Sequence, residues 1–418
     1  MRINIPRFAL FLISVIAFFW FIPNFYTKAF RLDTFHIGGF FSPITKEFVI
    51  WEAAPGKLTY KNEKGDELDR KAAQKTLPFM FYNSIDKWGA FPLESIDGKS
   101  ITYDEAKFGI QVLKLSVRDV LSDALPLFVL FESSPIGASL DMPSDMLLIK
   151  SDKAVFIDCA SGKIDEEKSQ SFTEALKDGG VTFPILKAFS NPTNLKPFDE
   201  GLLFADSGNR LFQLKMLNGA PFVKQISDTI DKKILHINVD ESDKKLFYGS
   251  VVTEDSIYII THEEGLKKLP LENYNPQTIS MSAYLTPMYH SIISNDLSVE
   301  NPPTLYRAAA KDFDIVHRYQ KDVPQDIIQK RERISYVLSF LTPFRIAQFN
   351  AFSNEVLFDI KPASSVFFAA LGIIFALILY IALNFKKKFY AVDLIAICLT
   401  GIPGFIALQI FGSFSKKV

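Results

Sequence analysis

The chain has 418 residues, enough for two or three domains or for one large β domain with membrane segments. Its formal net charge of −1 leaves no basic stripe to neutralise phosphates, which argues against nucleic-acid binding. The two cysteines are far apart in sequence, and Cys398 falls inside an apolar run. We therefore expect Cys159 and Cys398 to be free thiols.

The N-terminus has the pattern of a membrane anchor. Arg2 and Arg7 precede an apolar run over residues 8–22, as in a signal sequence. Because no small-x-small cleavage site follows this run, we predict an uncleaved transmembrane anchor over residues 1–26. A cleaved signal peptide is the alternative.

Residues 27–323 show a faint repeat of β type. Six times, an apolar run is followed by a short polar turn and a second apolar run, at the spacing of one propeller blade. This pattern predicts a large, mostly β, propeller-like extracytoplasmic domain of about six hairpin units. An irregular β-rich domain is the alternative, because no WD or kelch signature accompanies the repeat. The paired runs are 48–51/57–60, 101–103/108–113, 146–149/154–157, 202–204/211–214, 246–248/256–260 and 305–307/313–316.

Helical patterns interrupt and follow the β runs. Residues 68–76 and 169–177 read as short helices. Residues 324–340 form an amphipathic pattern within a juxtamembrane segment that we assign to 324–362.

The last segment, 363–418, predicts a transmembrane helical hairpin. Two apolar runs, 363–385 and 389–411, each have the roughly 20 residues needed to span a bilayer. Between them stand Lys386, Lys387 and Lys388, which cannot lie in lipid. The fold predicted is thus a β-rich domain with one N-terminal and two C-terminal transmembrane helices.

Basic residues predict the orientation. Those beside the long extracytoplasmic loop are discounted, because long loops translocate largely regardless of charge. Five basic residues then remain on one side of the membrane and two on the other, which places the N-terminus and the lysine turn in the cytoplasm. The five are Arg2, Arg7, Lys386, Lys387 and Lys388; the two are Lys416 and Lys417; Lys28, Arg31 and Lys361 are the discounted ones.

Small residues recur on the C-terminal helices. Ala396, Thr400 and Gly404 follow one another every fourth residue, and Gly372 and Ala376 offer a second such face. These five residues form a predicted helix-packing face.

Asp393 is an ionisable residue inside an apolar run, which marks a possible intramembrane polar site. The alternative is that it pairs with Lys388 near the membrane boundary.

No catalytic or ligand motif is present. The sequence lacks G-x-S-x-G, H-E-x-x-H, C-x-x-C and EF-hand patterns, so we predict no catalytic, cofactor or metal residues. Met281, Met288 and His290 could suit copper(I), but methionine beside aromatic residues more often fills a core.

Several short stretches resemble an uncharacterised membrane-protein family of Gram-negative anaerobes, known mainly as a domain of unknown function. The resemblance covers nearly the whole chain and implies the company of ABC-transporter components; no catalytic residue is assigned in that family. The stretches are 41–43, 48–51, 77–82, 141–145, 156–158, 168–176, 199–201 and 212–215.

We therefore expect an inner-membrane protein with a periplasmic domain. Its expected role is that of a non-enzymatic accessory or scaffold subunit of a membrane transport or assembly complex, with a membrane-protein partner. The alternative is a periplasmic enzyme or ligand-sensing module that uses a propeller's central pocket.

Overall fold

The computed structural model describes residues 2–30, 36–54, 57–121, 126–137, 139–299, 301–347, 359–385, 390–413 and 415–416. The chain divides into two compact units. The helical unit comprises residues 1–36, 53–57 and 323–418. The sheet unit comprises residues 37–52 and 58–322.

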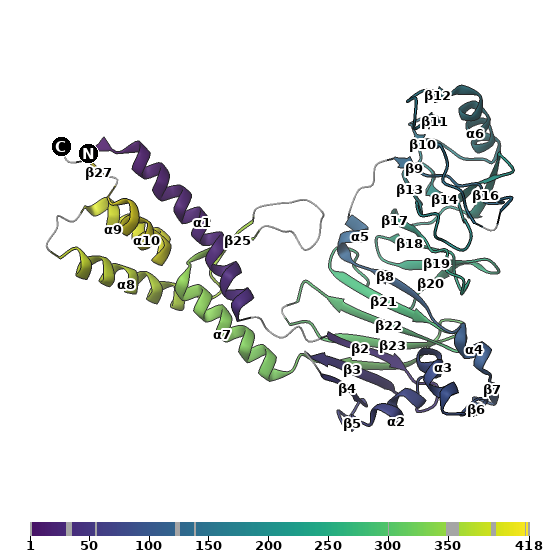
Figure 1. The fold of residues 1–418 in the computed structure, drawn as a ribbon, viewed down its shortest axis with the longest axis horizontal. Helices are drawn as coiled ribbons and strands as arrows, with labels where there is room; N and C mark the ends of the chain where they lie inside the picture. Colours follow the sequence, from purple (N-terminus) through teal and green to yellow (C-terminus); the bar gives the residue numbers. More distant parts are fainter. Residues whose placement is uncertain are drawn as a thin grey trace. The chain divides into compact units, whose positions relative to one another are not determined.

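The sheet unit confirms the predicted β-rich fold. Its described residues form five sheets of four or five strands (Figure 1), and the strand pairs whose register is described are antiparallel. Three sheets are simple meanders: β9 (Leu127–Phe128), β10 (Asp145–Ile149), β11 (Ala154–Asp158) and β12 (Ile164–Asp165); β13 (Lys187–Ser190), β14 (Leu202–Ala205), β15 (Leu211–Leu217) and β16 (Ala220–Ser227); β17 (Ile234–Val239), β18 (Gly249–Thr253), β19 (Ile257–Thr261) and β20 (Gly265–Lys268).

The other two sheets come from the two ends of the unit's sequence. The strands β2 (His36–Phe41), β3 (Phe48–Ala54), β4 (Lys57–Lys61) and β5 (Glu67–Leu68) form one of them. The other has five strands in the order β24 (Ile315–Lys321), β23 (Thr304–Ala310), β22 (Tyr289–Asp296), β21 (Ile279–Leu285) and β8 (Gln111–Leu115).

Hydrophobic clusters stack these sheets into a row. One cluster joins β9–β12 to β13–β16, and the next two continue through β17–β20 to the five-stranded sheet. A fourth, containing Ile50 and Tyr306, joins that sheet to β2–β5. Strands β14 and β18 are buried along their whole length; β14 is an unbroken apolar run, whereas β18 also buries the polar Ser250 and Thr253. Within the described residues no cluster joins the two end sheets of the row.

Small helices cover the sheets. The predicted helices at 68–76 and 169–177 are confirmed as α2 (Arg70–Lys75) and α6 (Glu166–Asp178). The remaining elements are α3 (Pro78–Lys87), α4 (Tyr103–Lys107), α5 (Val117–Leu121) and the hairpin of β6 (Leu93–Ile96) with β7 (Lys99–Ile101).

The second predicted hairpin unit, 101–103/108–113, is wrong. Helix α4 separates its two runs and is started by a capping box between Thr102 and Glu105. Strand β7 therefore pairs with β6, and β8 joins β21 as a fifth strand. Four other units are neighbouring strands as predicted. In the unit 246–248/256–260 the first strand begins only at Gly249. The missing second unit lies in the sequence between the two end sheets of the row, β2–β5 and β9–β12.

The helical unit contains α1 (Ile5–Ala29), α7 (Gln325–Leu341), α8 (Val366–Leu383), α9 (Ala391–Thr400) and α10 (Ile402–Phe411). Helix α7 confirms the amphipathic pattern. It runs beside the start of α8, with Tyr336 stacked on Phe368 at 4.8 Å between ring centroids. Short pairs complete the unit: β25 (Phe344–Ala347) with β26 (Asp359–Pro362), and β1 (Arg2–Ile3) with β27 (Ser415–Lys416).

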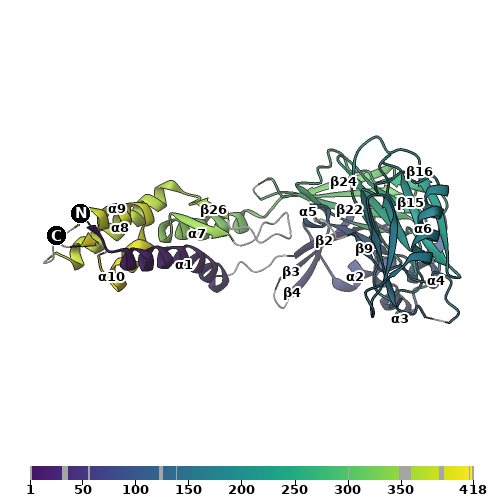
Figure 2. The ribbon, with the colours of Figure 1, turned by 90° about the horizontal axis from the view of Figure 1, so that it is seen from above.

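The second C-terminal run is not one long helix, which corrects the predicted hairpin of two spanning helices. It breaks at Gly401, whose φ of +66° favours glycine, and the chain reverses there. After the reversal the Ser413 hydroxyl donates to Asp393 Oδ1 at 2.9 Å, so the end of α10 lies beside the start of α9. Both views show α9 and α10 next to α1 and α8 (Figure 1, Figure 2).

These helices differ in length, and therefore in whether they can cross a membrane. Among the described residues, two helices are long and apolar enough to span a membrane, α1 with 25 residues and α8 with 18. Helices α9 and α10 have 10 residues each, about 15 Å at a helical rise of ~1.5 Å, or half a bilayer core. The lysine turn 386–388 lies outside the described residues.

Candidate functional site

Asp393 is the most deeply buried acidic group of the helical unit's described residues. It lies in the first turn of α9 with 0% exposure. The Tyr380 hydroxyl of α8 donates to its Oδ2 at 2.8 Å, and Ser413 donates to Oδ1. Arg7 of α1 donates to the Ser413 carbonyl at 3.3 Å. The predicted alternative partner, Lys388, lies outside the described residues. Asp393 thus links three helices by hydroxyl hydrogen bonds, which a buried carboxyl group requires.

The five residues of the predicted helix-packing face are divided among three contacts. Ala376 and Ala396 belong to one apolar cluster that also contains residues of α1 and α10. Gly372 instead faces α7, where a Cβ would lie 1.9 Å from the Phe340 carbonyl oxygen. Thr400 and Gly404 meet each other across the turn, since a Cβ at Gly404 would lie 1.8 Å from Thr400 Oγ1. A larger residue at Gly404 would therefore disturb the α9–α10 turn.

Gly401 is a positioning residue that the small-residue pattern missed. Its φ of +66° and ψ of −140° lie in a region that is nearly restricted to glycine. A Cβ there would also lie 3.1 Å from Cδ of Pro343. The sequence Gly401-Ile402-Pro403-Gly404 could have indicated this break, because glycine followed by proline marks the end of one helix and the start of the next.

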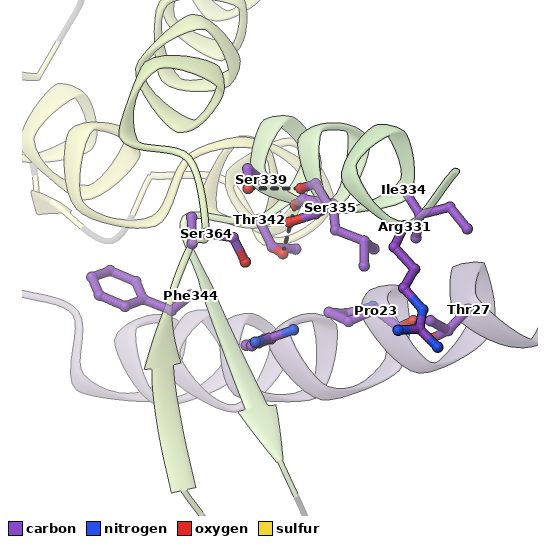
Figure 3. Close-up of a pocket in the computed structure, with 12 residues that line it drawn as sticks. Pro23, Thr27, Arg331, Ile334, Ser335, Ser339, Thr342, Phe344 and Ser364 are labelled. Carbon is purple, nitrogen blue, oxygen red and sulfur yellow. Dashed lines mark hydrogen bonds between the residues drawn. The ribbon is translucent and has the colours of Figure 1, made fainter. Parts of the chain in front are cut away.

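A cavity of about 160 Å³ lies at the other end of the two long helices (Figure 3). Figure 3 shows Arg331 extending from α7 toward Thr27 of α1, with Ser364 and Phe344 on the far side. Two arginines line the cavity, and the described lining contains no carboxylate. The lining residues are Pro23, Thr27, Arg331, Ile334, Ser335, Leu338, Ser339, Thr342, Phe344, Arg345, Ala363 and Ser364.

The cavity's helical hydroxyls already have acceptors for their protons. Ser339 donates to the Ser335 carbonyl at 2.7 Å, Thr342 donates to the Leu338 carbonyl at 3.1 Å, and Thr27 donates to the Pro23 carbonyl. The charged donors that line the cavity are therefore the guanidinium groups of Arg331 and Arg345. Their fixed forks of N–H groups suit planar or tetrahedral oxyanions.

Residues 39–304, more than half of the chain, match the family model of a domain of unknown function, DUF4857. The chain belongs to the DUF4857 family. The match covers most of the sheet unit and ends at the first residue of β23, before β24 and the helices α7, α8, α9 and α10. No curated protein matches the chain significantly.

The DUF4857 region contains a buried charge cluster that sequence reasoning missed. Lys196 Nζ lies 2.5 Å from Asp199 Oδ1 and 2.9 Å from Glu241 Oε1, and these three side chains are at most 2% exposed. Lys196 and Asp199 precede β14, whereas Glu241 follows β17, so the cluster joins two neighbouring sheets. The residues are scattered in the sequence, and no local pattern announces them.

Further hydrogen bonds satisfy the cluster's acidic oxygens. The Asn191 amide donates to Glu241 Oε2 at 2.9 Å, and the Glu200 backbone N–H donates to Oε1 at 2.6 Å. Ser133 donates to Asp199 Oδ2 at 2.5 Å. Burial raises the pKa of Glu241 above its ordinary value, which the Lys196 charge and these donors oppose. A network this fully paired fits a structural role better than catalysis.

The DUF4857 region also carries an open cavity of about 440 Å³ beside the β21–β22 turn. His262 and His290 line it with three lysines and two glutamates, and Lys267 pairs with Glu264; these charged residues are Lys245, Lys267, Lys311, Glu263 and Glu264. His290 is 5% exposed, stacks on Phe313 at 4.4 Å and has a buried Nδ1 without a hydrogen-bond partner. Burial lowers the pKa of His290 to about 4.

Residues considered for copper are not brought together. Met281 packs in the cluster between β17–β20 and the five-stranded sheet, whereas Met288 packs on the β6–β7 side. Within the described residues no group of three or more histidine, cysteine or acidic side chains could hold a metal ion. Cys159 and Cys398 are both free and exposed, as predicted.

Proposed function

We propose that this chain is a membrane-anchored, non-enzymatic accessory or scaffold subunit of a membrane transport or assembly complex. The observation that carries the proposal is the α9–α10 hairpin. One span suffices to anchor a domain, and α1 provides it; α8 adds a second span. Helices α9 and α10, at about 15 Å each, are too short to cross and would enter and leave the bilayer on one side. Helices beyond those that anchoring needs are best explained by a membrane-protein partner.

The outward faces of the long helices support a membrane location over a soluble core. In the most apolar window of α1 only 11% of residues are buried, and in that of α8 17%. A core helix of a soluble protein would be mostly buried. Phe367 and Leu399, for example, are 67% and 65% exposed. Such side chains are stable in lipid and costly in water.

The hairpin also strengthens the proposed orientation. The sequence prediction set Lys416 and Arg2 on different sides of the membrane. In the structure β27 pairs with β1, and Lys416 is the register partner of Arg2. When basic residues are assigned to the nearest span end by their place in the sequence, this end receives seven, against three at the other end. This balance supports a cytoplasmic N-terminus and a periplasmic DUF4857 domain. The seven are Arg2, Arg7, Lys386, Lys387, Lys388, Lys416 and Lys417; the three are Lys28, Arg31 and Lys361.

Cysteine labelling in intact spheroplasts tests this placement. The native Cys159 is exposed on the sheet unit and serves as the reporter of the periplasmic side once Cys398 is replaced by serine. Single cysteines at Lys387 and Val418, each with Cys159 and Cys398 replaced, report the other end. An impermeant maleimide should label Cys159 directly and the two end positions only after lysis. Labelling at 418 but not at 387 in intact cells would show that the last run crosses the bilayer.

We propose a complex of ABC-transporter type, because the chain resembles proteins found with ABC-transporter components. Purification of the full chain from the inner membrane in mild detergent should recover a membrane-protein partner in a fixed ratio. Gly401→Leu should reduce that recovery by disturbing the hairpin turn, whereas Ile13→Leu, an exposed apolar exchange on α1, should not. A chain that purifies without any partner would refute the subunit role.

A ligand-sensing role is the second candidate, and the 440 Å³ cavity favours it. Its lining sets three lysines and two histidines against two glutamates, and this excess of basic groups would suit a small anionic ligand. Thermal melting of the full chain with small carboxylates and phosphates tests this role. A rise in melting temperature that Lys267→Ala abolishes would favour the sensor over the scaffold.

A further inference from the structure

The cavity between α1, α7 and the start of α8 lies where both long helices leave the apolar layer. Pro23 and Thr27 belong to the last two turns of α1, and Ala363 and Ser364 immediately precede α8. Asp393 and Ser413 mark the opposite end of the same helices, beside Tyr380 and Arg7. If α1 and α8 span the membrane as proposed, this cavity lies at the depth of the lipid headgroups.

The charge of the cavity selects its ligand. Arg331 approaches from α7 and Arg345 from β25, and no carboxylate lies among the lining residues described. The Ser339 and Thr342 hydroxyls are turned to helix carbonyls, and the two guanidinium groups bring the positive charge that attracts an oxyanion. Arginine binds phosphate oxygens through two parallel N–H bonds, which a lysine or a hydroxyl cannot reproduce.

The apolar part of the lining points to the source of that phosphate. Ile334, Leu338 and Phe344 line the same cavity as the two arginines. A free phosphate ion gains nothing from such side chains, whereas a phospholipid places its glycerol and first acyl carbons directly below its phosphate. Basic pockets between membrane helices hold lipid headgroups on the cytoplasmic side of membranes, and the same attraction of arginine for phosphate would act in the periplasmic leaflet.

We propose that this cavity binds a phosphate group through Arg331 and Arg345, and that the group belongs to a phospholipid of the periplasmic leaflet. The inference rests on the proposed membrane placement of α1 and α8. Lipid bound there would join α7, which leads from the DUF4857 domain, to both spanning helices.

Native mass spectrometry of the purified full chain with added phosphatidylglycerol tests the proposal. The parent chain should retain the lipid. Arg331→Gln and Arg345→Gln should each weaken retention roughly fivefold, and the double variant roughly thirtyfold, at about a factor of five per basic residue. Arg333→Gln is the matched control, because Arg333 is an exposed arginine on α7 that does not line the cavity. Melting curves of the variants verify that each is folded.

A parallel titration with inorganic phosphate distinguishes the two sources. Lipid retention that millimolar phosphate does not displace assigns the site to phospholipid. Phosphate binding without lipid retention keeps the phosphate chemistry and overturns the lipid assignment. Retention by the double variant within twofold of the parent, or an equal loss in Arg333→Gln, overturns the site itself. The titration does not depend on the membrane, so its result stands apart from that of the labelling experiment.

Discussion

The sheet unit and the helical unit bury polar groups in different ways. In the sheet unit Lys196 lies between two carboxylates and charge neutralises charge. In the helical unit, the partners described for Asp393 are the hydroxyls of Tyr380 and Ser413. The two units also treat apolar side chains oppositely: the sheet unit buries Phe156 completely, whereas the helical unit exposes most of Phe367. The difference accords with the proposal that water surrounds the sheet unit and lipid surrounds the helical unit.

Removing the central charge of the sheet unit should have the largest effect. Lys196→Ala leaves Asp199 and Glu241 buried without their cation, which costs about 3 to 5 kcal/mol of unfolding free energy. Thermal melting of the full chain in detergent measures the loss. Arg318→Ala, which breaks an exposed pair with Glu272, is the control and should change stability by less than about 1 kcal/mol. Similar losses in both variants would mean that the buried cluster contributes no more than a surface pair.

Acid should weaken the sheet unit through His290. Its pKa is about 4 in the folded state and ~6.5 when unfolded, so the unfolded chain binds more protons between these pH values. The free energy of unfolding should therefore fall by about 3 kcal/mol as the pH drops from about 6.5 to about 4. His290→Phe keeps a ring against Phe313 and should flatten this dependence. His262→Phe, at a side chain 47% exposed, should leave it in place. Melting curves across that pH range decide, and an unchanged acid slope in His290→Phe would exclude His290 as its source.

Asp393 offers the matching test in the helical unit. Asp393→Ala removes the acceptor of two hydroxyl hydrogen bonds and should cost about 2 kcal/mol. Asp393→Asn keeps one acceptor oxygen and should recover about half of the loss. The melting transition of the full chain in detergent reports both. Equal stability of all three proteins would show that Asp393 is not a structural link between helices.

The smallest effect concerns the hairpin turn. Gly401→Ala forces a side chain into a backbone region nearly restricted to glycine and toward Pro343, at a cost of about 1 to 2 kcal/mol. Thr400→Ala, one residue earlier and still helical, should cost less. Limited proteolysis of the C-terminal segment in detergent should show faster cleavage in Gly401→Ala alone. Equal cleavage rates would mean that the turn tolerates other residues.

Local pattern was enough to predict the longest helices and several of the strand pairs. Helices α1, α6, α7 and α8 follow from apolar periodicity and caps, which act within a few residues. The β-rich class followed from paired apolar runs separated by short polar turns. The second hairpin unit failed because the capping box of Thr102 and Glu105 started a helix where a turn was expected.

Tertiary structure alone decided the arrangements that join distant residues. Composition made 389–411 look like one span, but Gly401 reverses the chain and brings Ser413 to Asp393. The meeting of Lys196 with Glu241 and the cavity between Arg331 and Arg345 depend on packing between elements that no local pattern records. Sequence determines which segments can form helices and strands, because propensity and capping are local. Which of their faces meet depends on burial summed over the whole chain.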